Sequence, residues 1–335
     1  MKVDQLIILL LIFAGYCCNL EAQKINGLSF VASDNAIGDK EVEPVIRVHA
    51  NYVSLMPFGF MKSLSEPEIA FNKPRQWFGE RVEGVRQYAK TLRKKNIRIM
   101  LKPQIWVWRG EFTGRITMQT EERWKVLEQS YASFILLYAK VAQEIGADIF
   151  CIGTELENFV MHRPEYWKSL IISIRKVYQG ALTYAANWDE FKRVPFWGAL
   201  DYIGVDAYFP LSQRKSPTVE VLEAGWKVHK QEIMTVQSSY LKPILFTEFG
   251  YRSMDYTGKS PWDSRRIEGS VNLDAQSNGL NAIYRQFWKE DWFAGGFVWK
   301  WFVDYEQAGG LKNNRFTPQN KPAEQVLKQL FGTKK

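Results

Sequence analysis

Eight short apolar segments recur along the chain, and segments of helical periodicity separate most of them. Most of the eight are apolar on both faces, which is typical of strands buried in a parallel sheet. The predicted strands are residues 24–32, 50–57, 97–103, 148–155, 181–187, 201–208, 243–250 and 295–302. Eight is the number of parallel strands that closes an α/β barrel, so the pattern predicts a single (β/α)8, or TIM, barrel. An open doubly wound sheet is the alternative, although no glycine-rich phosphate-binding turn follows the first strand.

The intervening segments carry apolar residues at the i, i+3, i+4 spacing of amphipathic helices. The predicted helices are residues 80–95, 121–145, 165–178, 218–239, 274–291 and 321–331. Residues 188–200, which follow the fifth strand, contain no well-defined helical pattern. A chain of 335 residues is long enough to form such a barrel as one domain.

The N-terminus has the pattern of a secretory signal. Lys2 precedes an apolar core of about ten residues, which is too short to span a bilayer. We predict a signal peptide over residues 1–22 with cleavage after Ala22, so that residues 23–335 form the barrel domain. The expected location is therefore outside the cell, in the periplasm or at the cell surface, with no transmembrane segment in the mature chain. A lipid anchor at Cys17 or Cys18 is the competing interpretation.

Charge and potential metal ligands exclude several classes of function. The formal net charge is +8, but the basic residues are spread along the chain and no nucleic-acid motif is present. His49, His162 and His229 are scattered without clusters of cysteines or carboxylates, so we predict no metal site and no cofactor. Cys151 lies inside an apolar strand and is expected to be a small core residue. A monomer is the default expectation.

Polar and aromatic side chains gather at the carboxyl ends of the predicted strands. That end of a TIM barrel is where its active sites lie, and core packing does not explain the pattern. The residues are Lys102, Gln104, Trp106 and Trp108 after the third strand, Glu155 on the fourth, Asn187 and Trp188 on the fifth, Asp206 and Tyr208 on the sixth, Glu248 on the seventh, and Trp299 and Trp301 on the eighth. We expect Trp299 and Trp301 to share a face, because side chains alternate along a strand.

Glu155 and Glu248 are the candidate catalytic pair. Strands four and seven of an eight-stranded barrel face each other across its mouth. Two carboxyl groups in that arrangement meet the needs of glycoside hydrolysis, in which one protonates the leaving oxygen and the other attacks the anomeric carbon or activates water. A separation of about 5–5.5 Å would allow a covalent intermediate and retention of configuration. The flat faces of the nearby tryptophans suit the apolar faces of sugars.

The sequences around these strand ends resemble a known family. "IGTELEN" and "LFTEFGYRS" are similar to the acid/base and nucleophile strands of the clan A retaining glycosidases. Together with "VSLMPFGF", "IMLKPQIWVWRGEFTG", "YIGVDAYFP" and "GFVWKWF", they most resemble glycoside hydrolase family 113, the β-mannanases. The resemblance extends from the first predicted strand to the eighth.

The resemblance implies a retaining hydrolase that cleaves β-1,4-mannosidic linkages in mannan or glucomannan, as an endo-β-1,4-mannanase does, although exo action stays open. It makes Glu155 the general acid/base and Glu248 the nucleophile, with Tyr208 holding the nucleophile by a hydrogen bond. We expect Glu155 to have a raised pKa, because apolar surroundings and the charge of Glu248 both favour its protonated form. The implied substrate-binding residues are Lys102, Gln104, Trp106, Asn187, Asp206, Tyr208, Trp299 and Trp301.

Three residues leave alternatives open. Thr154 stands where most of the clan has an asparagine that bonds the sugar 2-hydroxyl, a change that is compatible with the axial 2-hydroxyl of mannose. Gln104 stands where a histidine is expected in this family. Glu157 competes with Glu155 as the acid/base, because residues two apart on a strand point the same way. We expect Glu157 beyond the barrel rim, in a loop or at the start of a helix.

Two other functions remain as alternatives. One is a clan A hydrolase of another β-linked glycan, such as glucan or xylan. The other is a non-catalytic barrel that binds carbohydrate, for which the usual signature is loss of a catalytic glutamate. Both glutamates are present in this chain.

Overall fold

The structure is a computed structural model that describes residues 23–265 and 270–333. The predicted signal peptide, with Cys17 and Cys18, therefore lies outside the described residues. Among the described residues no helix is long and apolar enough to cross a membrane.

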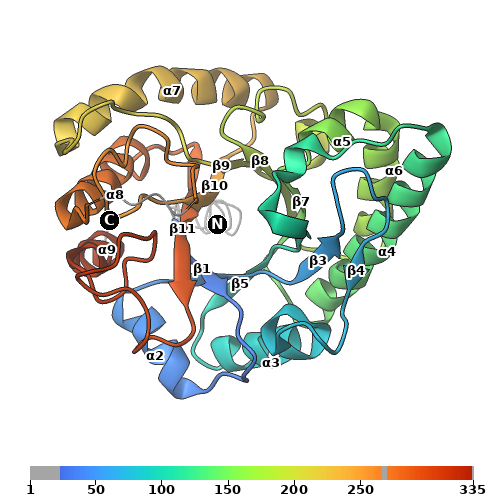
Figure 1. Cartoon of the computed structure of the whole chain (residues 1–335), viewed down its shortest axis with the longest axis horizontal. Coiled ribbons are helices and arrows are strands. Elements are labelled where there is room, and N and C mark those ends of the chain that lie inside the picture. Colours follow the sequence, from blue (N-terminus) through green and yellow to red (C-terminus); the bar gives the residue numbers. More distant parts are fainter. Residues whose placement is uncertain (1–22, 266–269, 334–335) are drawn as a thin grey trace, which may run out of the picture.

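The eight predicted strands form one closed, parallel barrel (Figure 1). Its strands are β1 (Ile25–Val31), β2 (Tyr52–Leu55), β5 (Arg98–Leu101), β7 (Ile149–Thr154), β8 (Ala181–Asn187), β9 (Ile203–Asp206), β10 (Ile244–Phe249) and β11 (Phe293–Phe302). They follow one another around the barrel in chain order, and β11 closes it by pairing in parallel with β1. The prediction of a single (β/α)8 barrel is confirmed.

Helices surround the barrel on its outside (Figure 1). They are α2 (Asp39–Arg47), α3 (Val82–Arg93), α4 (Glu121–Glu144), α5 (Glu157–His162), α6 (Pro164–Arg175), α7 (Val219–Tyr240), α8 (Leu273–Phe287) and α9 (Pro322–Gly332). The six predicted helices are all present. The sequence did not predict α2, which is short, rich in charge and contains Pro44, or α5, which is too short to display a helical period. Residues 188–200 contain only a short 3-10 turn at Trp197–Ala199, as expected.

Side-chain caps fix where three of the longest helices begin. Thr120 accepts a hydrogen bond from the backbone of Arg123 at the start of α4, and Thr218 caps α7 in the same way. Asn272 accepts from the backbone N–H of Ala275 at the start of α8. Each cap satisfies an N–H group that the helix itself leaves unpaired.

A second, three-stranded sheet lies at the carboxyl end of the barrel and was not predicted. It consists of β3 (Phe58–Met61), β4 (Ala70–Phe71) and β6 (Gln104–Val107), with β6 parallel to β3. Because β6 begins only three residues after β5 ends, both strands fall within what the sequence pattern presents as one strand and its following loop. This sheet fixes the positions of Gln104 and Trp106.

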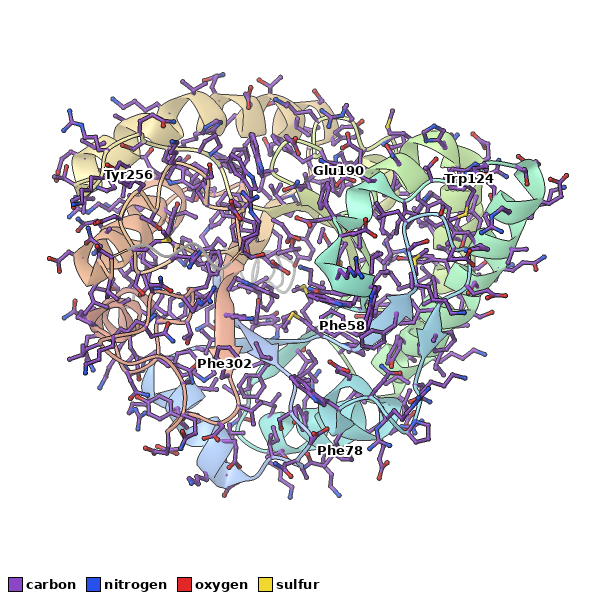
Figure 2. All side chains as sticks on the ribbon, in the orientation of Figure 1. Phe58, Phe78, Trp124, Glu190, Tyr256 and Phe302 are labelled. Atoms are coloured by element: carbon purple, nitrogen blue, oxygen red, sulfur yellow. The ribbon has the colours of Figure 1, made fainter. Side chains whose placement is uncertain are left out.

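The core has two parts. Side chains fill the space between the barrel and its helices (Figure 2). A smaller apolar layer fills the barrel interior and consists of Ile25, Tyr52, Met100, Ile149, Leu245 and Phe297. Within the same strands, polar side chains are buried nearer the carboxyl ends, including Lys102, Asp206, Thr247 and Glu248. The barrel is therefore closed by apolar residues at one end and carries buried charge at the other.

Candidate active site

The carboxylate of Glu248 is held in place by three donors. Glu248 lies near the end of β10 and is 6% exposed. The hydroxyl of Tyr208 donates to its Oε2 at 2.8 Å, and Nε2 of Gln104 donates to its Oε1 at 3.0 Å. The ammonium group of Lys102 also bonds to Oε1. The predicted hydrogen bond from Tyr208 to Glu248 is confirmed, and the three bonds together fix the direction of the carboxylate.

A buried ammonium group links two carboxylates at the carboxyl end of the barrel. Nζ of Lys102 lies 3.2 Å from Oδ1 and 3.3 Å from Oδ2 of Asp206 while it also bonds to Glu248. The hydroxyl of Thr247 donates to Oδ1 of Asp206 at 2.7 Å. Burial opposes the charge on Lys102, but the two carboxylates outweigh it and raise the pKa of Lys102 above its ordinary value. Burial and the charge of Glu248 raise the pKa of Asp206, while Lys102 opposes that shift.

Glu155 follows the last residue of β7 and shares this electrostatic environment. Its backbone is in the left-handed region, with φ of 50°. Its N–H donates to the carbonyl of Ala185 at 2.8 Å, and its carbonyl accepts from the hydroxyl of Thr113 at 3.0 Å. Burial, followed by the charges of Asp206 and Glu248, raises the pKa of Glu155 well above its ordinary value. A carboxyl group in this environment favours the protonated form.

Glu157 lies apart from this cluster. It is the first residue of α5, and Nε of Arg193 donates to its carboxylate at 2.6 Å. The prediction that Glu157 starts a helix beyond the rim is confirmed. Since Glu157 is engaged by an arginine while the charges of Asp206 and Glu248 act on Glu155, the structure favours Glu155 as the partner of Glu248.

The other predicted substrate-binding residues differ in exposure. Trp106, on β6, is 49% exposed, and Trp299, on β11, is partly exposed. Asn187, the last residue of β8, is partly exposed, and its Oδ1 accepts from the backbone N–H of Trp188 at 2.8 Å. Gln104 and Tyr208 are buried against Glu248. Trp106, Trp299 and Asn187 thus offer surface that a sugar can contact.

The prediction that Trp301 lines a subsite is wrong. Its side chain is fully buried and packs near the ring of Tyr305, with ring centroids 6.2 Å apart. The alternation that placed it with Trp299 is interrupted. Leu28 of β1 pairs with Val298, whereas Phe30 pairs with Trp301, so β11 contains one extra residue over this stretch. A bulge of this kind changes which face the following side chain occupies.

Lys102 and Asp206 were also expected to bind the substrate, but their burial differs from that expectation. Both are almost fully buried, with 0% and 1% of their surface exposed, and both contact the residues around Glu248. With so little surface left for a sugar, they act on the site by holding its charged groups.

Two residues near the site were missed in the sequence. Thr247 directly precedes Glu248 within the seventh predicted strand, and a hydroxyl beside a charged group was the signal that could have found it. Trp262 is 44% exposed in the loop after β10, and its ring stacks on Trp188 with centroids 5.0 Å apart. Trp262 lies far beyond the end of β10, so the pattern of polar and aromatic residues at strand ends does not include it.

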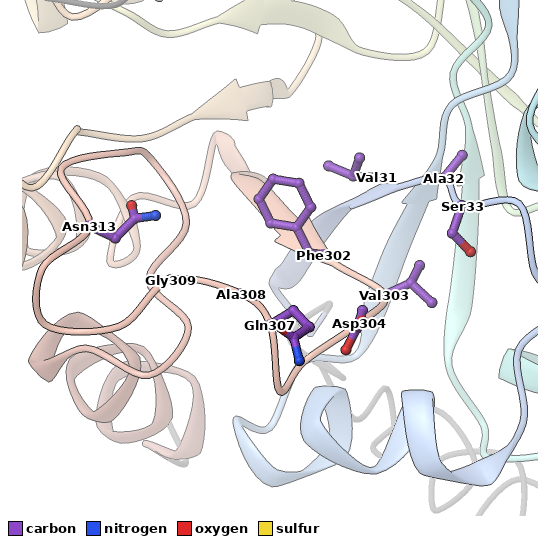
Figure 3. A pocket seen from close by; sticks show the side chains of 10 residues that line it. All are labelled: Val31, Ala32, Ser33, Phe302, Val303, Asp304, Gln307, Ala308, Gly309 and Asn313. Atoms are coloured by element: carbon purple, nitrogen blue, oxygen red, sulfur yellow. The ribbon is translucent and has the colours of Figure 1, made fainter.

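Two cavities lie near the carboxyl ends of the strands. One of about 240 Å³ lies between the end of β1 and the segment after β11, where Val31 and Phe302 line it (Figure 3). The other, of about 540 Å³, is formed by the loops after β9 and β10 and includes Lys215 and Arg252. Neither is lined by Glu155 or Glu248, so the chemistry of the glutamates lies outside both.

Metal and thiol chemistry have little basis in the described residues. Within residues 23–265 and 270–333, no group of three or more histidine, cysteine, aspartate and glutamate side chains could hold a metal ion. Cys151 is fully buried in β7, where burial raises the pKa of its thiol to about 11. It is a core residue, as predicted.

Comparison with known proteins decides the family. The model of Glycoside Hydrolase Family 113 matches residues 33–321, which is most of the chain. The chain belongs to glycoside hydrolase family 113. It is therefore a glycoside hydrolase and acts on a polysaccharide or oligosaccharide. A comparison with curated protein sequences gave no match.

Solved structures of this family have the same barrel. The GH113 β-mannanase AaManA from Alicyclobacillus acidocaldarius is 27% identical, with a TM-score of 0.79 over 92% of this chain and 97% of that one. A GH113 β-1,4-mannanase is 22% identical, with a TM-score of 0.80 over 93% of this chain and 100% of the other. The β-glucuronidase of Ruminococcus gnavus is 14% identical, with a TM-score of 0.63 over 92% of this chain and 50% of the enzyme, and shares the fold alone.

Proposed function

We propose that this family 113 hydrolase is a retaining β-1,4-mannanase, with Glu248 as the nucleophile and Glu155 as the general acid/base. The observation that carries the proposal is the contrast between the two carboxyl groups. Glu248 is held by donors from Lys102, Gln104 and Tyr208, whereas burial and the charges of Asp206 and Glu248 raise the pKa of Glu155. Two carboxyl groups with different environments are what acid and nucleophile roles require.

The first half of the reaction forms a covalent intermediate. The carboxylate of Glu248 attacks the anomeric carbon while Glu155 gives its proton to the glycosidic oxygen, and the bond between that carbon and oxygen breaks. The leaving sugar departs with a new hydroxyl group, and the remaining sugar is bound to Glu248 as an ester. Tyr208 and Gln104 keep Glu248 aimed at the anomeric carbon throughout this step.

The second half restores the enzyme. Burial and the charge of Asp206 still raise the pKa of Glu155 once Glu248 is esterified, but the further contribution from the charge of Glu248 is lost. The pKa of Glu155 falls, and the carboxylate can now take a proton from water as that water attacks the anomeric carbon. The ester bond to Glu248 breaks, and two inversions at one carbon give net retention.

Two features support mannan as the substrate. The structural neighbours of this family include proteins described as a β-mannanase and a β-1,4-mannanase. Trp106 and Trp299 present aromatic surface at the mouth of the barrel, as needed to bind the apolar faces of pyranose rings. Another β-linked glycan remains the second candidate, because the same catalytic pair would hydrolyse glucan or xylan.

A substrate panel tests the proposal. The purified protein is incubated with β-mannan, glucomannan, cellulose and xylan, and released reducing ends are measured. Defined manno-oligosaccharides then give the product profile and separate endo from exo action. We expect clear preference for the mannans. Preference for cellulose or xylan would reject the mannanase assignment, and tight binding to every glycan without release of reducing ends across a pH series would favour a non-catalytic barrel.

We also propose that the protein is exported, because residues 1–22 have the pattern of a signal peptide. A monomer is the proposed oligomeric state. Mass spectrometry of the protein from its native host should find Gln23 at the N-terminus, and size-exclusion chromatography should give the mass of a monomer. A diacylglycerol modification at Cys17 or Cys18 would instead establish a lipid anchor.

A further inference from the structure

A chain of buried hydrogen bonds connects Glu190 to the backbone beside Glu155. The N–H of Leu156 donates to the hydroxyl oxygen of Tyr184 at 2.7 Å, and that hydroxyl donates to Oε1 of Glu190 at 2.6 Å. The second carboxyl oxygen of Glu190 accepts from the N–H of Asn187 at 3.0 Å. Glu190 therefore ties the end of β8 to the residue that follows Glu155.

All three residues of this hydrogen-bond network are buried. Leu156, Tyr184 and Glu190 are each at most 1% exposed, and Figure 2 shows Glu190 close to the end of β8. The ring of Tyr184 is packed edge-on against Trp167 and Phe196, so its hydroxyl cannot swing to another partner without repacking. Burial of a carboxyl group is unfavourable unless its oxygens are bonded, and both oxygens of Glu190 are bonded.

The backbone at Glu155 requires such support. A non-glycine residue with φ of 50° is in a sparsely populated conformation, which persists only when its surroundings hold it. Three hydrogen bonds hold this turn: from Glu155 to Ala185, from Thr113 to Glu155 and from Leu156 to Tyr184. Only the last of these continues to a buried carboxyl group, that of Glu190.

We propose that Tyr184 and Glu190 are positioning residues that hold the left-handed backbone at Glu155 and so aim its carboxyl group at the glycosidic oxygen. This role rests on the proposed function of Glu155 as the acid/base. Neither residue touches the sugar. Their effect is on the direction from which the proton is delivered, because proton transfer needs the acid within hydrogen-bond reach of the leaving oxygen.

The same chain links Glu155 to the rim at β8. Asn187, whose backbone Glu190 binds, is a residue with surface available to a sugar. The β8 rim is therefore connected to the turn at Glu155 through three hydrogen bonds, from Asn187 to Glu190, from Tyr184 to Glu190 and from Leu156 to Tyr184. This connection makes Glu190 a link between the sugar-contacting rim and the proton donor.

The test uses Tyr184→Phe with Tyr178→Phe as its matched control. Tyr178 is equally buried, and its hydroxyl donates to the carbonyl of Ala147 at 2.8 Å, just before β7 begins. Both substitutions remove one buried hydroxyl from a contact with the β7 region, but only Tyr184→Phe acts at the Glu155 end. Glu190→Gln is a second, milder break, because its amide can replace only one of the two acceptor oxygens.

Two measurements are made on the full-length variants. The first is hydrogen exchange of peptides that contain the Leu156 amide, which reports on the tether without any need for activity. The second is kcat/KM for a series of aryl β-manno-oligosaccharides with leaving groups of increasing pKa, which reports on how well Glu155 delivers its proton.

We expect Tyr184→Phe to accelerate exchange at Leu156 and to lower kcat/KM for the poorest leaving group roughly tenfold or more, with little change for the best one. Glu190→Gln should shift both readouts in the same direction by less, and Tyr178→Phe should shift neither. Unchanged exchange at Leu156 in both Tyr184→Phe and Glu190→Gln would overturn the tether. If exchange at Leu156 is faster but kcat/KM falls equally for every leaving group, the network stabilises the fold and does not position the carboxyl group of Glu155. If the wild-type protein hydrolyses none of these substrates, the proposed function fails, while the exchange data still decide whether the tether exists.

Discussion

The hydroxyl of Tyr208 donates a hydrogen bond to Oε2 of Glu248 over 2.8 Å, and both side chains are buried. This bond joins a residue beyond the end of β9 to the candidate nucleophile on the neighbouring strand β10. It leaves one oxygen of Glu248 facing Tyr208 and the other facing Lys102 and Gln104. The orientation of the nucleophile is thus set by residues that follow β9 and β5 and by the first residue of β6.

Tyr208→Phe should lower kcat on β-mannan about tenfold to a hundredfold, because a hydrogen bond to a charged group contributes about 1.5–3 kcal/mol. Steady-state kinetics on soluble mannan measure the effect. Tyr138→Phe is the control, since its hydroxyl donates to the carbonyl of Glu80 on the outside of the barrel. Equal rates for the two variants would mean that the bond from Tyr208 does not position Glu248.

Lys102→Met should destabilise the fold by about 3–5 kcal/mol at neutral pH, because it leaves Asp206 and Glu248 buried without a cation. In the variant, loss of the Lys102 charge raises the pKa of Asp206 in the folded protein further above its unfolded value. The folded state then binds more protons than the unfolded state, so the stability of the variant relative to wild type should decrease as the pH rises.

Urea denaturation at acidic and at mildly alkaline pH measures this difference in the free energy of unfolding. Lys192→Met removes a surface partner of Glu232, with both side chains about 40% exposed, and should cost less than about 1 kcal/mol at either pH. A loss for Lys102→Met that does not depend on pH would contradict the proposed link between the lysine and the two carboxylates.

Glu155→Ala should lower kcat/KM on mannan by a factor of about 10²–10⁴, while aryl substrates with good leaving groups keep most of theirs. Added azide should restore turnover of those aryl substrates by replacing the water that Glu155 normally activates. Glu157→Ala is the control on the competing glutamate and should be close to wild type. The reverse result, with azide rescue in Glu157→Ala, would exchange the roles of the two residues.

The wild-type pH profile provides an independent check on Glu155. The acid must be protonated at the start of the reaction, and burial with the neighbouring charges raises its pKa. Activity should therefore persist below that raised pKa and fall as the pH rises through it. In Glu155→Ala the alkaline decline in kcat/KM should be absent.

Trp106→Ala should weaken binding of manno-oligosaccharides about tenfold with little change in kcat, because its half-exposed ring offers stacking surface away from the reacting atoms. Isothermal titration calorimetry measures the affinity directly when each variant also carries the inactivating substitution Glu248→Ala. Tyr240→Ala removes an exposed aromatic residue at the end of α7 and should leave the affinity unchanged. Equal affinities in the two variants would remove Trp106 from the binding surface.

The sequence predicted the fold because each barrel strand is an apolar run with polar or aromatic residues at one end. The positions of Glu155, Glu248 and Tyr208 followed from those strand ends. Trp301 could not be placed, since the extra residue in β11 depends on pairing with β1, which sequence alternation does not reveal. Lys102 was expected to line a sugar subsite; its full burial depends on two carboxylates from distant strands that converge on it, which the sequence does not reveal.

The Glu155–Tyr184–Glu190 connection shows a second limit of sequence interpretation. Tyr184 lies inside an apolar strand, and Glu190 lies in a loop rich in charged residues. The sequence therefore does not distinguish either residue from its neighbours. Their connection to the turn at Glu155 depends on the hydrogen bond from Leu156 to Tyr184, which joins the segment after β7 to the neighbouring strand β8. Such relationships become visible only after the strands are placed in three dimensions.

The most direct test of the central claim is to trap the covalent intermediate with a 2-deoxy-2-fluoro-β-mannosyl fluoride. The fluorine at C2 slows both steps, and the fluoride leaving group permits the first step, so the glycosyl-enzyme should accumulate. Peptide mass spectrometry should find one sugar on Glu248, with none on Glu155 or Glu157. A label on another residue would contradict the assignment, and so would an inverted anomeric product in the absence of any label.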